Sequence, residues 1–245
     1  MKDYLKEFNS LLQNLDRSKT VSTVFEDFLS LSTYALAQPF YRNKEFEKSH
    51  LDIVNRYKKE QAEKFSQMLA LVVVALDDEY QDFLGKVFSL NCFGNARKGQ
   101  FFTPYHVSKM MAKINCIELK EKIDQNNFIT LSEPCCGSGG MIIAFAEAMR
   151  EEGHNYQNQL FVEAIDIDET CFKMAYIQLS LLGIPARVML GDSLAWKFQR
   201  VLYTPFYFVN GFELKLKQVQ EKTEIKPIIM KTEQLKLFSM QYDIK

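Results

Sequence analysis

The glycine-rich segment at 133–140 constrains the fold of this chain more than any other part of its sequence. It reads Glu133-Pro134-Cys135-Cys136-Gly137-Ser138-Gly139-Gly140; an apolar stretch precedes it and a stretch with helical spacing follows it. The segment is therefore predicted to connect a strand to a helix. Glycine lacks a Cβ atom, so such a turn can adopt positive φ and bring bare N–H groups close to a ligand. Taken alone, it is compatible with a nucleotide, a flavin or no ligand.

Short apolar runs punctuated by glycine and proline continue from Gly94 onward, which predicts alternating strands and helices. Helices are expected to begin near Gly139 and Glu169 and to end at Gly153 and Gly183. This βαβαβ order predicts a parallel sheet with right-handed crossovers. The strands are expected over 128–131, 160–165 and 187–190.

The part of the chain before residue 94 is predicted to be helical. It holds few glycines and prolines, and its apolar residues recur every three or four positions. The run from Thr23 to Glu26 has the form of a capping box, in which Thr23 caps a helix that Gln38-Pro39 ends.

Two further helices are expected in this N-terminal part. A longer amphipathic helix is expected from about Lys44, and its charged residues carry mixed signs. Mixed charge of this kind is typical of a solvated helix face rather than a DNA-binding patch. The last helix is expected to begin at Asp77 or Asp78 and to end near Asn91.

Acidic side chains follow the second and third predicted strands. Asp166 ends the second strand, where a carboxylate can accept hydrogen bonds from ribose hydroxyls. Asp168 is assigned instead to the cap of the helix that begins at Glu169. Asp192 follows the third strand, where an acid could meet the amino group of adenine.

A helix start precedes all of these segments. Thr103 is a natural N-cap residue and Pro104 a natural first helical residue. A helix N-terminus with a hydroxyl beside it suits a carboxylate. The adjacent Phe101 and Phe102 are compatible with core packing or with contact to a ligand.

Taken together, Gly-Gln-Phe-Phe-Thr-Pro, the glycine-rich segment, the acidic strand end and Gly-Asp-Ser-Leu resemble the modification subunits of type I restriction systems and related DNA adenine-N6 methyltransferases. The resemblance covers roughly residues 20 to 195. It implies an α/β fold, in which a helical domain precedes a Rossmann-like methyltransferase sheet, with S-adenosylmethionine as cofactor. The implied contacts are Gln100, Phe101, Phe102, Thr103, Pro104, Glu133, Gly137, Ser138, Gly139 and Gly140, with Asp166 at the ribose and Asp192 at the adenine.

The sequence departs from this family at the residues that would act on the methyl acceptor. The family carries Asn/Asp-Pro-Pro-aromatic after the fourth strand, where oxygens accept the N6 hydrogens and the ring stacks on a flipped adenine. At the corresponding place stands Tyr203-Thr204-Pro205-Phe206, which lacks the amide or carboxylate acceptor. Two functions stay open: a DNA adenine-N6 methyltransferase, with these four residues at the catalytic position, or a catalytically inactive cofactor-binding protein with an interaction or regulatory role.

The C-terminal part of the sheet is expected to be shortened, since the family's sheet continues with further strands. A hairpin is predicted instead, with strands at 206–209 and 212–216 and a turn at Asn210-Gly211. There is no room for a target-recognition domain, so DNA is expected to be selected by a separate specificity subunit. The predicted parts are a helical domain at 1–93, a cofactor-binding domain at 94–211, and a hairpin strand with a lysine-rich tail at 212–245.

The tail carries a short motif with two interpretations. The residues Gln234, Leu235, Leu237 and Phe238 resemble the peptide by which bacterial replication and repair proteins bind the sliding clamp. The same residues are compatible with an edge strand whose side chains alternate between its faces.

Composition narrows the class of protein further. The net charge is −1, so the chain as a whole lacks the basic footprint of a protein that binds DNA unaided. A charged N-terminus and the absence of a long apolar run predict a cytoplasmic protein without a membrane partner. The five cysteines are expected to be reduced, with Cys135 and Cys136 packed in a tight turn. No metal site is expected, because His50, His106 and His154 lack ligand spacing.

Overall fold

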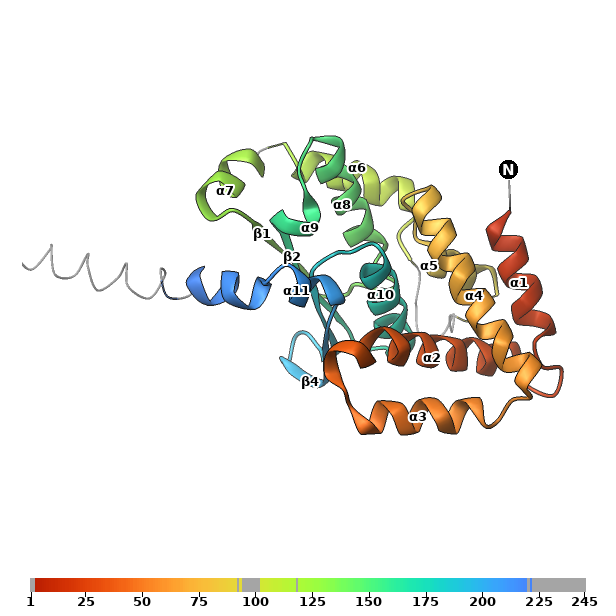
Figure 1. Cartoon of the computed structure of the whole chain (residues 1–245). Helices are drawn as coiled ribbons and strands as arrows, with labels where there is room; N and C mark the ends of the chain where they lie inside the picture. Colours follow the sequence, from red (N-terminus) through yellow and green to blue (C-terminus); the bar gives the residue numbers. More distant parts are fainter. Residues whose placement is uncertain (1–2, 92, 94–101, 118, 220, 222–245) are drawn as a thin grey trace, which may run out of the picture. The chain divides into compact units, whose positions relative to one another are not determined.

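The computed structural model describes residues 3–91, 93, 102–117, 119–219 and 221 (Figure 1). The chain divides into two compact units, Met1–Asn210 and Gly211–Lys245, and each is described by itself. No helix in the described ranges has the length and apolar character needed to cross a bilayer.

The N-terminal part is helical, as its apolar spacing predicted. Its core contains the ring of Phe8, which meets the rings of Phe28 and Phe83 edge to face at 5.2 and 5.6 Å. These contacts join the first two helices of the chain to a third that lies more than forty residues further along. The helices are α1 (Tyr4–Asn14), α2 (Val21–Tyr41), α3 (Lys44–Val54), α4 (Lys59–Asp78) and α5 (Phe83–Leu90).

Both predicted ends of helix α2 were wrong. Thr20 is the N-cap residue, because its hydroxyl accepts a hydrogen bond from the N–H of Thr23 at 3.1 Å and the helix already begins at Val21. Pro39 lies inside the last turn, where its missing N–H costs a single helical hydrogen bond. The helix ends only when Arg42 adopts the left-handed conformation, with φ 47°.

The amphipathic segment from Lys44 forms two helices, α3 and α4, rather than one. Helix α4 runs through the predicted start of the next helix and stops at Asp78, because Glu79 is extended. Asp82 then caps α5: its carboxylate accepts from the N–H of Gly85 at 2.9 Å. The predicted end near Asn91 is confirmed.

Strands and helices alternate after the helical part, as predicted. Strands β1 (Ile129–Glu133), β2 (Leu160–Asp166) and β3 (Ala186–Asp192) pair in parallel. The described residues add β4 (Lys197–Tyr203), which pairs antiparallel with β3. The sheet order is β1-β2-β3-β4, so β1 has no described strand on its outer side.

Helices connect and cover these strands. Helix α8 (Gly140–Glu151) follows β1, and α10 (Glu169–Leu181) follows β2 and packs against α2. Gly153 and Gly183 end them with φ of 83° and 69°, as predicted. The remaining helices of this part are α6 (Tyr105–Asn115), which packs on α8, α7 (Leu119–Asn126), which contacts β1, and α9 (Tyr156–Gln159).

The predicted C-terminal hairpin was wrong, because both of its expected strands are helical. Helix α11 (Pro205–Val209) begins after Thr204 and has Pro205 at its first position, a favourable helix start. Residues 212–219 are also helical, so Asn210-Gly211 is a turn between two helical segments. The aromatic run at 206–208 does not distinguish a strand period from a helical one.

Candidate functional site at the glycine turn

The turn after β1 adopts a backbone that depends on glycine. Gly137 and Gly139 have φ of 55° and 93°, in the left-handed region. A Cβ atom on Gly137 would lie 3.0 Å from carbons of the Phe102 ring. Because Gly139 has no side chain, no side chain caps the N-terminus of α8. The turn therefore brings backbone N–H groups and an aromatic ring to one place.

Asp166 connects this turn to the loop after β2. Its carboxylate accepts hydrogen bonds from the N–H of Gly137 at 2.8 Å and from the N–H of Asp168 at 2.9 Å. Burial raises the pKa of Asp166 above its ordinary value. Asp168 caps α10, as predicted, by accepting from the N–H groups of Thr170 and Cys171.

Glu133 lies beside this carboxylate, at the end of β1. It is half-buried, and its carboxylate accepts a long hydrogen bond, 3.4 Å, from the N–H of Cys135. Burial raises the pKa of Glu133, and the nearby charge of Asp166 adds to the effect. Two acidic groups therefore approach each other where β1 and β2 end.

The structure adds Asp82, which the sequence analysis did not assign to the site. The Ser138 hydroxyl donates to Asp82 at 2.5 Å, and the amide of Gln178 donates to Asp82 at 2.9 Å. Gln178 also donates to the carbonyl of Ser138 at 2.8 Å and accepts from the N–H of Leu84 at 3.0 Å. Helix α5, the glycine turn and helix α10 are joined at this point.

Asp82, Glu133 and Ser138 line a small cavity of about 80 Å³. No lysine or arginine is among the described residues on its wall. The wall brings together six residues predicted from the sequence, namely Phe102, Thr103, Glu133, Gly137, Ser138 and Gly140. The other lining residues are Asp82, Cys135, Cys136 and Met141.

The predicted helix start beside the cavity is displaced by one residue. Pro104 is the N-cap residue of α6, with ψ of 135°, and no side chain caps the helix, so Thr103 is not the cap. Pro104 restricts the residue before it to extended conformations, which keeps Thr103 outside the helix. Gln100 and Phe101 lie outside the described residues.

Asp192 lies at the same end of the sheet but outside the wall of the small cavity. Its carboxylate accepts from the N–H groups of Leu194 and Ala195, and so shapes the turn between β3 and β4. Leu194 is 97% exposed, and Ile167, which follows Asp166, is 70% exposed. Each carboxylate at these two strand ends is thus accompanied by an exposed apolar side chain.

The segment from Tyr203 to Phe206 does not join the other predicted site residues. In the β3–β4 pairing, Tyr203 lies opposite Arg187, whereas Asp192 lies opposite Lys197. Five residue steps separate Arg187 from Asp192 along β3, roughly 16 Å at about 3.3 Å per residue. The position assigned to catalysis therefore lies at the opposite end of the sheet.

Contacts at that opposite end are structural. Thr204 is fully buried, and its hydroxyl accepts from the N–H of Ala186 at 2.9 Å and donates to the carbonyl of Ile184 at 2.7 Å. The Phe206 ring packs closely on Gly183, since a Cβ atom on Gly183 would lie 3.1 Å from it. Tyr203 stacks near Tyr207, with ring centroids 4.2 Å apart.

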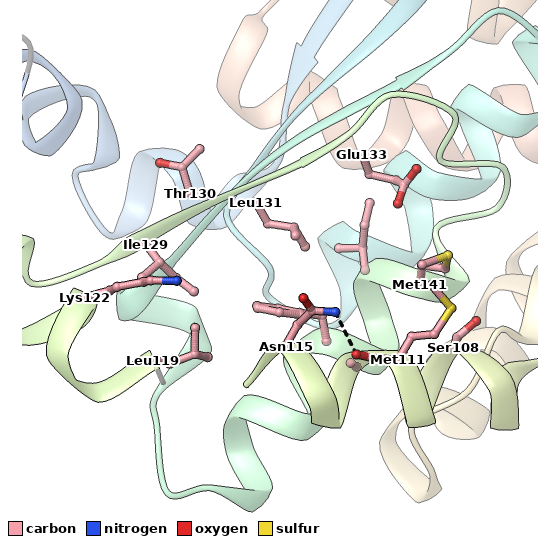
Figure 2. Close-up of a pocket in the computed structure, with 13 residues that line it drawn as sticks. Ser108, Met111, Asn115, Leu119, Lys122, Ile129, Thr130, Leu131, Glu133 and Met141 are labelled. Carbon is pink, nitrogen blue, oxygen red and sulfur yellow. Dashed lines mark hydrogen bonds between the residues drawn. The ribbon is translucent and has the colours of Figure 1, made fainter. Parts of the chain in front are cut away.

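A larger groove of about 340 Å³ runs beside β1 (Figure 2). Glu133 and Met141 line both this groove and the small cavity, so the two spaces adjoin. The rest of its wall is mostly apolar and comes from α6, α7, β1 and α8. The other lining residues are Ser108, Met111, Ala112, Asn115, Leu119, Lys122, Ile129, Thr130, Leu131, Ile142 and Phe145.

The adjacent cysteines of the turn differ in their surroundings. Cys136 is buried, and burial raises the pKa of its thiol well above the ordinary value, whereas Cys135 is exposed. Only Cys136 therefore packs as a small core residue. In the part of the chain that the structure describes, no group of three or more His, Cys, Asp or Glu side chains could hold a metal ion.

Comparison with known families identifies the larger group to which these features belong. The sequence profile of the family described as N-6 DNA Methylase matches residues 74–202. The chain belongs to the N-6 DNA methylase family. The match includes Asp82, the glycine turn, Asp166 and Asp192, and it stops before Tyr203.

Two curated relatives from Methanocaldococcus jannaschii are named as methylase subunits of type I restriction enzymes. The MjaVIII subunit is 29% identical over 161 residues, covering 58% of this chain and 26% of that protein. The MjaIX subunit is 25% identical over 114 residues, covering 46% of this chain and 18% of that protein. The aligned part thus spans about a quarter or less of these relatives.

Two solved structures resemble this chain weakly. One is described as a class I S-adenosylmethionine-dependent methyltransferase from Listeria monocytogenes, with 13% identity, a TM-score of 0.40, and coverage of 79% of this chain and 55% of that chain. The other is a type I restriction-modification methyltransferase subunit from Streptococcus thermophilus. It shares 13% identity and a TM-score of 0.40, with coverage of 80% and 59%.

Proposed function

We propose that this N-6 DNA methylase family member binds S-adenosylmethionine at the glycine turn. The observation that carries the proposal is a cavity with acidic side chains, no described lysine or arginine on its wall, and a bare glycine backbone. S-adenosylmethionine carries a sulfonium and an ammonium group, which are complementary to such a wall. When bound, it supplies a methyl group that is electrophilic because of the sulfonium charge.

The small cavity suits the amino-acid end of this cofactor rather than the whole molecule. Its wall holds Glu133 and Ser138 beside the start of α6, and the predicted cofactor contacts Gln100 and Phe101 come just before that start. We assign Asp166 to the ribose hydroxyls and Asp192 to the adenine amino group. The exposed side chains of Ile167 and Leu194 then flank a flat, apolar base.

For the methyl acceptor, we propose adenine N6 in DNA, reached through a separate specificity subunit. The support is the family membership together with the relatives, which are methylase subunits of type I restriction enzymes. The full activity would need an acceptor group for the N6 hydrogens, and Tyr203 to Phe206 lie at the opposite end of the sheet. We therefore propose that a segment other than 203–206 supplies this group, within a cytoplasmic complex.

The same observation favours a second candidate function: a cofactor-binding protein that transfers no methyl group and acts through interactions. Titration calorimetry tests cofactor binding, which both candidates require. Wild-type protein should bind S-adenosylmethionine, and Asp166→Ala should not. Asp27→Asn is the control, because Asp27 is also buried but pairs with Arg56 and Tyr57 in the helical part.

Methyl transfer separates the two candidates. Labelled S-adenosylmethionine is incubated with mixed genomic DNA, with and without the products of neighbouring genes. Incorporation that depends on Asp166 supports the enzyme, and its absence under every condition supports the interaction protein. If wild-type protein fails to bind the cofactor in calorimetry, both candidates are wrong.

The proposed sliding-clamp contact through Gln234, Leu235, Leu237 and Phe238 lies outside the described residues and stays a prediction. Clamp protein should be retained by the immobilised chain, and changing Leu237 and Phe238 to alanine should release it. Absence of retention by the intact chain would end this hypothesis.

A further inference from the structure

The carboxylate of Asp82 is buried without a described cationic partner. The residue is 7% exposed, and no lysine or arginine among the described residues forms an ion pair with it. Burying a carboxylate is costly unless a charge or several hydrogen bonds compensate for the lost hydration. This carboxylate thus differs from that of Asp27, which is also buried but is paired with Arg56 at 2.7 Å.

The hydrogen bonds of Asp82 use both oxygens of its carboxylate. Its donors are the N–H of Gly85, the hydroxyl of Ser138 and the amide of Gln178, all of them neutral. Asparagine and serine cap helices about as well as aspartate does. A neutral acceptor could therefore begin α5, but only a carboxylate has the two acceptor oxygens that Ser138 and Gln178 together use.

Asp82 lies on the wall of the small cavity and in contact range of the glycine turn. A Cβ atom on Gly140 would approach its carboxylate oxygen at 3.0 Å. Its hydrogen bond fixes the hydroxyl proton of Ser138, which leaves the oxygen lone pairs of Ser138 as acceptors. A cation held by Ser138 would thus sit next to an oxygen that Asp82 orients and polarises.

We propose that Asp82 is a positioning residue for the ammonium group of S-adenosylmethionine and acts through Ser138. The helical part of the chain thereby contributes a charge to a cofactor site whose other residues lie on the sheet side. Gln178 keeps the arrangement in register, since it donates to both Asp82 and the carbonyl of Ser138. This inference rests on the proposed function, because it assumes that the cofactor's amino-acid end occupies the small cavity.

The test compares three ligands on the full chain: S-adenosylmethionine, S-adenosylhomocysteine and 5′-methylthioadenosine. The first two carry the ammonium group, only the first carries the sulfonium, and the third lacks the amino-acid end. Asp82→Asn keeps the shape of the side chain, removes its charge and replaces one of its two acceptor oxygens by an NH₂ group. It should weaken the first two ligands about tenfold and the third by less than about twofold.

Asp27→Asn is the matched control, since it removes a buried carboxylate that is remote from the glycine turn. It should leave the affinity ratios of the three ligands unchanged, whatever its effect on the melting temperature. Equal weakening of all three ligands by Asp82→Asn would overturn the ammonium assignment, because it would mean that Asp82 only holds the turn. The ammonium assignment would also be wrong if Asp82→Asn weakened S-adenosylmethionine alone, because only that ligand carries the sulfonium.

Ser138→Ala keeps the test decisive if Asp82→Asn does not fold. It retains the carboxylate but removes the hydroxyl through which Asp82 acts. It should therefore also weaken S-adenosylmethionine and S-adenosylhomocysteine relative to 5′-methylthioadenosine. Unchanged ratios in Ser138→Ala would overturn the proposal. Failure of the proposed function has a different signature, since the wild-type protein itself would then not bind S-adenosylmethionine.

Discussion

The two ends of the parallel strands in this protein are built in opposite ways. Where β1, β2 and β3 end, Glu133, Asp166 and Asp192 place carboxylates beside positive-φ glycines and exposed apolar side chains. Where β3 begins, Thr204 is fully buried and satisfies two backbone groups, and aromatic rings cover the rest. The first end leaves carboxylates and backbone N–H groups available to a ligand. The second, which we call the closed end, uses its polar groups for hydrogen bonds within the fold.

The direction of a strand decides which end of the sheet its last residues reach. Tyr203 is the last residue of β4, just as Glu133 and Asp166 are the last residues of β1 and β2. However, β4 runs antiparallel to β3, so the residues after it return to the closed end. Changes at the carboxylate end should alter cofactor affinity, and changes at the closed end should alter the free energy of unfolding.

The largest effect is expected for Gly137→Ala. An alanine at φ 55° is strained, and its Cβ would press on Phe102 at 3.0 Å. Strain of about 1–3 kcal/mol in the binding-competent turn should lower cofactor affinity by up to about a hundredfold. Gly183→Ala, at φ 69° and the closed end, is the control, and it should cost stability without lowering affinity. Equal affinity losses in both variants would contradict the assignment of cofactor binding to one end of the sheet.

Thr204→Val should produce the reverse pattern. It leaves the N–H of Ala186 and the carbonyl of Ile184 without their side-chain partner in a buried position. The free energy of unfolding should fall by about 2 kcal/mol. Affinity for S-adenosylmethionine, measured well below the melting temperature, should change by less than about twofold. A large affinity loss would reveal a role for this segment in the cofactor site.

Cofactor affinity should fall as the pH is lowered, beginning above the pH at which ordinary carboxylates titrate. Burial raises the pKa values of Glu133 and Asp166 above their ordinary 4.5 and 3.8, so both accept protons earlier than exposed carboxylates. Each protonation removes a negative charge that favours the cationic ligand. The loss should reach at most about tenfold per pH unit for each group. Calorimetry between pH 8 and 5 checks this, and a flat profile would contradict it.

The smallest effect is expected for Leu194→Ala. The side chain is 97% exposed, so the free energy of unfolding should change by less than about 0.5 kcal/mol. Affinity should fall about threefold, equally for S-adenosylmethionine and 5′-methylthioadenosine, because the contact is with the shared base. An effect on only one of these ligands would mean that Leu194 does not contact the shared base.

Local signals in the sequence predicted much of this arrangement. The strands β1 to β3, the cap at Asp168 and the helix ends at Gly153 and Gly183 depend on neighbouring residues, and they were predicted within a few positions. Thr20 and Thr23 show the limit of such signals. Both residues suit an N-cap, and only the hydrogen bond between them shows which one takes it.

The network around Asp82 could not be predicted in this way. Its partners Ser138 and Gln178 lie 56 and 96 positions further along the chain. Nothing in the local pattern distinguishes Asp82 from Asp77 or Asp78 as a helix start. The direction of β4 is likewise a property of pairing across the sheet, so the position of Tyr203 had to come from the structure.

The outer edge of β1 has a consequence for work with the purified chain. Thr130 and Ser132 are exposed, and no described strand pairs with that side of β1. A row of backbone donors and acceptors of this kind acts as a template for any extended polypeptide. The fraction of monomeric protein should therefore fall as the protein concentration rises. This fraction should be larger when a lysine replaces Thr130.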